Sequence, residues 1–516
     1  MSTFPPPPPP PSPPREPNAH DDSSPFSAPP PWIPPGSPKR SRLGVVGLIA
    51  VIVVLALIAG GLYLIIDKIN DDGPDYPDEW DPRITELVEY AERARDLEFQ
   101  HPVDVEFLEE AAFLETLRTE TADLDAEARD QRDEADRQAV GYFRALGLLE
   151  GDVNLSEESS DLDDAGTLAY YDPETERVVV RGTELDIATE VTVVHELVHV
   201  LQDQHFDLED LSDAADEAFR ADPDGIVEGD ATRIEREYVD DLSESDQETY
   251  FEQYEDLGNP DAFDEVPLIL RLIRAAPYET GSQFVEILDA DDGNRSVDEA
   301  FDNPPRTEEQ LFDPSTFDRR ALARDVPEFS EENVDDIVYS DDEFGPMGWL
   351  LMLGEQIDTR TAMKAALGWG GDRARTVDDD GQICVEMRFV GDSDADEDEM
   401  HDALRSWRRA LPHGDDIDVR RHDNFVEVRA CDPGSDASDI TTDRSESAFV
   451  RQIQRLSFIE FALTDSDLEL DLEQATCMAD GIAITLTDDE LQADELNPAS
   501  TRAIGRIRRG CLGDEA

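Results

Sequence analysis

The alternation of apolar and polar residues predicts a mainly helical chain with a few short strands. In its first third, helices are expected over 84–99 and, as two or more segments, between 109 and 149. A strand is expected over 103–107 because apolar and acidic residues alternate there. These elements come before any segment that carries recognisable chemistry.

A hairpin followed by an apolar helix forms the next predicted unit. Two β-rich runs, 168–171 and 177–180, flank the turn signal Asp172-Pro173-Glu174-Thr175. The helix then begins near Ile187 and ends at about His205. An exposed strand edge just before this helix could pair with an extended peptide.

The remaining chain changes character near residue 375. The pattern is mostly helical from 221 to about 366 and helical again from 445. Between these parts, a small α/β module is predicted from strands over 383–389, 417–420 and 424–430 and a helix over 396–411.

These patterns divide the chain into six predicted regions. They are a disordered proline-rich tail (1–42), a transmembrane helix (43–66), an acidic linker (67–80), a catalytic domain (81–378), a small α/β module (379–436) and a helical C-terminal module (437–516).

The transmembrane prediction rests on the uninterrupted apolar run from Leu43 to Ile66, which is long enough to cross a bilayer of about 30 Å. Basic residues precede it and acidic residues follow it. The positive-inside rule then places the N-terminus in the cytoplasm and the C-terminal domain outside the cell. A cleaved signal peptide is the alternative, but a leader of this length favours an uncleaved anchor.

Charge excludes one class of partner. The chain has 125 acidic and 43 basic side chains, a formal charge of −82 and very few lysines. A surface of this kind repels nucleic acid, so no DNA or RNA partner is expected. It is typical of a halophilic-like, solvated acidic surface, and it leaves the oligomeric state open.

All four cysteines lie on the predicted outer side, where disulfides persist. Three pairings are possible. We predict Cys384 with Cys431 and Cys477 with Cys511, because each pair brackets a compact segment.

Candidate chemistry is concentrated in the helix that begins near Ile187. His195 and His199 are four residues apart, so both imidazoles can point at one ion from the same helix face. Glu196 lies between them, within reach of a water on that ion. This His-Glu-x-x-His pattern is typical of zinc hydrolases and predicts metal-assisted peptide hydrolysis with a Zn²⁺ cofactor.

A catalytic zinc ion needs a third protein ligand, and two candidates exist. His205 has metzincin spacing, but that motif needs the helix to break at a glycine, and Gln202 stands there instead. Glu228, in Glu228-Gly229-Asp230-Ala231, could reach the ion from a following helix. Asp230 could bond a ligand imidazole or cap the local backbone, whereas Asp203 and His205 are expected to be structural.

The Glu-Gly-x-Ala stretch resembles the gluzincins of the peptidase MA type, in which it supplies the third ligand. The segment from Pro277 to Val285 resembles their Tyr-x-x-Gly element, which gives Tyr278 the role of stabilising the tetrahedral intermediate. Segments 201–208, 304–311 and 368–373 resemble an uncharacterised group of membrane-anchored bacterial and archaeal surface proteins. The likeness covers about residues 84–435 and implies an α+β, predominantly helical, zincin-like fold.

Two functions follow from these predictions. The first is a membrane-anchored extracellular zinc peptidase with Glu196 and Tyr278 as catalytic residues and His195, His199 and Glu228 as metal ligands. Its substrate is a peptide or protein. The absence of an aminopeptidase-type amine-binding stretch favours an endopeptidase. The second is a surface binding or scaffold protein that keeps the zinc site without catalysis.

Overall fold

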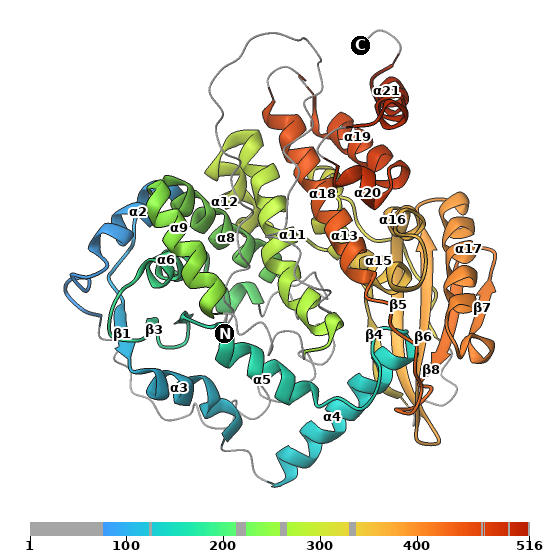
Figure 1. Ribbon diagram of the computed structural model, residues 1–516, viewed down its shortest axis with the longest axis horizontal. Coiled ribbons are helices and arrows are strands. Elements are labelled where there is room, and N and C mark those ends of the chain that lie inside the picture. The colour runs from blue at the N-terminus through green and yellow to red at the C-terminus, as the bar shows by residue number, and fades with distance from the viewer. Residues whose placement is uncertain are drawn as a thin grey trace.

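The described chain is mostly helical, and its strands form two separate sheets (Figure 1). The computed structural model describes residues 76–122, 126–212, 223–257, 266–329, 337–465, 468, 470–493 and 496–513. The expected combination of many helices with small sheets is therefore confirmed.

The helices and strands fall into two stretches of the chain, before and after the start of the second sheet. The first stretch consists of α2 (Thr85–Arg95), β1 (Asp104–Leu108), α3 (Glu110–Ala122), α4 (Ala126–Ala145), α5 (Leu155–Gly166), β2 (Ala169–Asp172), β3 (Arg177–Arg181), α6 (Ile187–Phe206), α8 (Asp224–Asp241), α9 (Glu244–Leu257), α11 (Leu268–Asp292), α12 (Asn294–Asp302), α13 (Glu308–Phe312) and α14 (Pro314–Asp318). The second consists of β4 (Ile337–Asp342), α15 (Gly345–Gln356), α16 (Thr359–Leu367), β5 (Trp369–Asp379), β6 (Gln382–Gly391), α17 (Asp394–Ala410), η2 (Gly414–Asp416), β7 (Asp418–Arg421), β8 (Val426–Cys431), α18 (Ser445–Thr464), α19 (Leu472–Thr485), α20 (Asp488–Leu491) and α21 (Pro498–Leu512).

The first sheet has the strand order β1-β3-β2, and β2 and β3 form the predicted hairpin. Strand β1 joins β3 in parallel. The expectation of an exposed hairpin edge is wrong: all four residues of β2 are buried because α6 packs against them. The backbone N–H of Tyr171 in β2 also donates to the carboxylate of Glu196.

Helix α6 confirms the predicted helix that carries the two neighbouring histidines. Its start is fixed by Asp186, whose carboxylate accepts from the backbone N–H of Thr189 at 3.0 Å. Its end is marked by Asp207 in the left-handed conformation, with φ 57°. Every residue from 191 to 202 is buried, so the polar side chains of this segment, such as His195 and His199, lie in the interior.

Helices α8 and α11 cross in backbone contact. A Cβ atom on Gly281 of α11 would lie 2.1 Å from the carbonyl oxygen of Gly225 in α8. A Cβ on Gly229 would lie 2.4 Å from the carbonyl carbon of Gly281. Only residues without a side chain allow this approach, so Gly229 and Gly281 set the distance between the two helices.

The second sheet is antiparallel with the order β4-β5-β6-β8-β7. The structure confirms the predicted strands β6, β7 and β8 and the helix α17 to within a few residues. The sheet also includes β4 and β5, which begin before the module predicted at 379–436. Glycines and charged residues in β5 weaken its strand signal, and it forms because β4 and β6 pair with it on both sides.

Both predicted disulfides are present. Cys384–Cys431 joins directly paired positions of β6 and β8, and Cys477–Cys511 joins α19 to α21. The helical tail from residue 445 is also confirmed. In Figure 1, α18 lies beside α11, and α19 to α21 lie at the end of the molecule opposite α4.

Among the described residues, no helix combines the length and apolar character needed to cross a membrane. The predicted span 43–66, the proline-rich tail and most of the acidic linker lie outside the described residues.

Candidate metal centre

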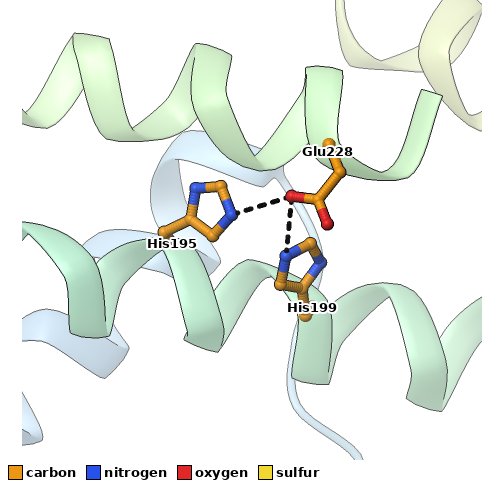
Figure 2. A group of neighbouring side chains, drawn as sticks. All are labelled: His195, His199 and Glu228. Atoms are coloured by element: carbon orange, nitrogen blue, oxygen red, sulfur yellow. Dashed lines mark hydrogen bonds and ion pairs between the residues drawn. The ribbon is translucent and has the colours of Figure 1, made fainter. Parts of the chain in front are cut away.

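His195, His199 and Glu228 come together between α6 and α8 (Figure 2). One ligand atom from each lies within 4.8 Å of the other two. The Oε2 atom of Glu228 is 3.2 Å from Nε2 of His195 and 3.5 Å from Nε2 of His199. These three residues can therefore hold a metal ion.

The hydrogen bonding of this cluster fits a cation-binding group. The Nε2 atom of His199 is buried, and apart from the 3.5 Å ion pair with Glu228 it has no hydrogen-bond partner among the described residues. Leaving a polar atom unsatisfied in the interior costs about 1–3 kcal/mol. A cation bound by the three residues would satisfy it, so the donor set fits a metal.

Local structure explains why these side chains meet. His195 and His199 are one turn apart on α6, and their ring centroids lie 4.7 Å apart. Glu228 is held opposite them because α8 packs along α6. The close crossing of α8 and α11 at Gly229 and Gly281 then places α11 beside the cluster.

Glu196 faces the first sheet from beside the cluster. Its Oε2 accepts from the backbone N–H of Tyr171 at 2.8 Å. Burial raises the pKa of Glu196 to about 7, although the positive charges of His199 and His195 act in the opposite direction. A carboxylate with this pKa can take up a proton near neutral pH.

Tyr278 lies in the middle of α11, with its ring stacked over that of His195 at a centroid distance of 6.1 Å. Burial raises the pKa of its hydroxyl well above the usual value, and the charges of Glu228 and Glu196 add to the increase. The phenol therefore keeps its proton and can act as a donor. The structure places it beside the cluster.

Two buried partners of the histidines were missed by sequence reasoning. Glu235 lies 3.1 Å from Nδ1 of His195, and Oε1 of Gln202 lies 2.9 Å from Nδ1 of His199. Glu235 is two turns after Glu228 on α8, and Gln202 is one turn after His199 on α6, so helical spacing could have found both. From the sequence, Gln202 was notable only as the residue that replaces a glycine.

Asp230 has neither of the two roles expected from the sequence. Within the described part of the chain it contacts no imidazole and caps no helix; its carboxylate accepts from Nε of Arg95 at 2.7 Å and from Nε2 of Gln202 at 3.1 Å. Asp230 therefore reaches His199 only through Gln202. Arg95, its partner, is 135 residues away in sequence, which is why the sequence did not reveal the pair.

His205 and Asp203 lie away from the cluster, as expected for structural residues. Nε2 of His205 is 2.9 Å from the carbonyl oxygen of Glu98. Asp203 accepts from the hydroxyl of Tyr171 and the backbone N–H of Leu208. The alternative third ligand, His205, is thus not part of the group.

The ionisable side chains of the cluster strongly influence one another's pKa values. Burial alone would lower the pKa of His195, but its bonds to Glu228 and Glu235 outweigh burial and raise the pKa to about 10. Burial alone would raise the pKa of Glu228, but the charge of His199 and the bond to His195 bring it below the usual value. The carboxylates around the two histidines therefore favour a positive charge between them, on an imidazole or on a bound cation.

The cluster is closed to solvent in this conformation. The exposed fractions of His195, Glu196, His199 and Glu228 are 0%, 2%, 1% and 4%. A substrate can reach these groups only after a neighbouring element moves.

No protein-family model, curated protein or solved structure matches the chain. The functional assignment therefore depends on the residues and geometry of the centre itself.

Proposed function

We propose that the protein is a membrane-anchored, extracellular zinc-dependent peptidase with a gluzincin-like catalytic domain. The observation that carries the proposal is the convergence of His195, His199 and Glu228, with Glu196 adjacent to them. The motif resemblance of the sequence supports the same class.

Zinc is the proposed ion because two imidazoles and one carboxylate are the ligand set of many catalytic zinc sites. Ligand atoms roughly 2.0–2.1 Å from a tetrahedral zinc ion lie about 3.3 Å from one another. The distances of 3.2 and 3.5 Å between Glu228 and the two histidines match this separation.

The chain supplies the other groups that peptide hydrolysis requires. A bound zinc ion would lower the pKa of a water molecule and polarise a carbonyl group. Glu196 would take the proton from the attacking water and pass it to the leaving amine. Tyr278 would donate a hydrogen bond to the negative charge that develops on the carbonyl oxygen.

The disulfides support the proposed location, since both persist in oxidising surroundings. The anchor at 43–66 would hold the domain outside the cell, with the N-terminus in the cytoplasm. A peptide or protein substrate and endopeptidase action remain part of this proposal.

The burial of the centre favours a second candidate, a non-catalytic surface binding protein in which the metal only stabilises the fold. All four central side chains are almost fully buried. A structural metal site is closed in this way, whereas a catalytic one keeps a position open to water.

Zinc content and peptide cleavage by the full chain would separate the two candidates. At high salt, the wild-type protein should contain zinc and cleave casein or a peptide library, whereas Glu196→Gln should contain zinc and cleave about 100-fold or more slowly. Glu190→Gln, on the same helix, should behave like the wild type. Zinc content without cleavage would support the binding protein, and equal cleavage by Glu196→Gln would remove Glu196 from catalysis.

A further inference from the structure

The side-chain amide of Gln202 can be oriented in only one way. Its nitrogen end faces the carbonyl oxygen of Val227 at 3.0 Å and the carboxylate of Asp230 at 3.1 Å. Both neighbours only accept hydrogen bonds, so the NH₂ group must point at them. The amide oxygen is therefore directed at Nδ1 of His199, 2.9 Å away.

This orientation determines where His199 carries its hydrogen. An amide oxygen can only accept, so Nδ1 of His199 must be the donor. In the neutral ring, the lone pair is then on Nε2, the atom that faces Glu228. Nε2 is also the buried atom without a hydrogen-bond partner in the described chain.

The position of Asp230 is itself fixed by Arg95, a residue of the first described helix. Its carboxylate binds Arg95, the last residue of α2, and both side chains are fully buried. Arg95 also contacts Asp298 of α12 at 2.6 Å. A continuous chain of contacts therefore joins α2 to His199 through Asp230 and Gln202.

The two histidines are held by different chemistry. His195 has a carboxylate, Glu235, at its Nδ1 atom. His199 has a neutral amide that can accept at Nδ1 only while Asp230 and Val227 occupy its other end. The orientation of His199 therefore depends on residues far from it in sequence.

We propose that Gln202 is a positioning residue for the metal ligand His199, and that Asp230 and Arg95 keep its amide in the required orientation. This role rests on the proposed metal centre, but it does not require hydrolysis. Groups that orient a metal-bound histidine contribute about 10- to 100-fold to metal affinity.

The test is the zinc affinity of the full chain, measured by competition with a chromogenic chelator. Gln202→Met removes the acceptor at nearly constant volume and should weaken zinc binding about 10- to 100-fold. Gln202→Glu keeps an oxygen opposite Nδ1 but loses the NH₂ donor to Val227 and Asp230, so its zinc affinity should also fall below the wild-type value. Asp230→Asn should cause a smaller loss than Gln202→Met, because Val227 still holds the amide.

Gln356→Met is the matched control. Gln356 is also buried, and its amide nitrogen donates to the carbonyl oxygens of Gly147 and Ile440, far from the centre. This variant should keep wild-type zinc affinity. The absorption spectrum of Co²⁺ bound in place of zinc should change in Gln202→Met but not in Gln356→Met, because only the first alters a ligand's orientation.

Each outcome has a distinct meaning. Equal zinc affinity in Gln202→Met and the wild type would overturn the positioning role, as would an equal loss in Gln356→Met. A wild-type chain that binds no zinc would overturn the metal centre and this role together. A wild-type chain that binds zinc without cleaving peptides would overturn the peptidase, while weaker zinc binding by Gln202→Met would still support the positioning role.

Discussion

The contact between α8 and α11 makes Gly281→Ala a sharp test of how the centre is assembled. An alanine Cβ at this position would lie 2.1 Å from the carbonyl oxygen of Gly225. The clashing atom is backbone, so it cannot rotate away as a side chain would. The two helices must separate, and Tyr278, one turn before Gly281, must move with α11.

The size of the effect follows from two opposing terms. Real Cβ atoms stay at least 3.0 Å from such an atom, so the helices must move apart by roughly 0.9 Å. Overpacking of this kind costs about 1–3 kcal/mol. Alanine is favoured over glycine inside a helix by about 0.5–1 kcal/mol, which offsets only part of the cost. We expect a net loss of about 1–2 kcal/mol in the free energy of unfolding.

Chemical denaturation and zinc titration of the full chain would measure the two consequences. Gly281→Ala should unfold at lower denaturant concentration and bind zinc more weakly, because Glu228 is on α8, one of the two helices that must separate. Gly510→Ala is the control: a Cβ added at this position of α21 would meet no described atom within 4 Å, so the variant should be neutral or stabilising. Wild-type stability and zinc affinity in Gly281→Ala would refute the close crossing.

Three further outcomes are expected. Removing zinc with a chelator should lower the unfolding midpoint, since zinc at about 100 times its Kd stabilises the folded chain by about 2.7 kcal/mol; an unchanged midpoint would argue against a bound metal. Burial and the charge of Asp372 raise the pKa of Glu343 from 4.5 to about 8, so its protonation stabilises the fold below pH 4.5, and that stability is lost as the pH rises through 8. Glu343→Gln should therefore raise the midpoint at about pH 9 and change it little at about pH 4, and the opposite order would contradict this pKa direction. Replacing Cys477 and Cys511 by serine should cost about 3–4 kcal/mol and speed hydrogen exchange in α21, while zinc affinity stays constant.

Elements with strong local patterns could be predicted from the sequence. Helix α6 has a capping aspartate and a segment rich in apolar residues, and the β2–β3 hairpin has a turn signal between two β-rich runs. Strand β5 could not be predicted in the same way. Its alternating residues include charges that are satisfied only across the sheet, such as Arg375 with Glu386 of β6.

The same distinction applies within the centre. His195 and His199 could be predicted because a metal restricts the residue types and one helix sets their spacing. The Arg95–Asp230–Gln202 contacts could not, because they join three helices that come together only in the folded chain. Their residue types are ordinary for helices, so only the fold distinguishes them from surface charges.

The two sides of the centre differ in how firmly they are held, and this limits how a substrate could enter. On the α11 side, backbone contacts at Gly281 are reinforced by Arg236 of α8, which binds Ser282 and Glu279 of α11. On the β2 side, Glu196 is held by a single backbone hydrogen bond from Tyr171. A peptide strand that paired with the outer edge of β2 would need that same N–H. The peptidase proposal therefore requires Glu196 to release this N–H when a peptide pairs with β2, while the Tyr171–Asp203 hydrogen bond and the packing of α6 keep β2 in place.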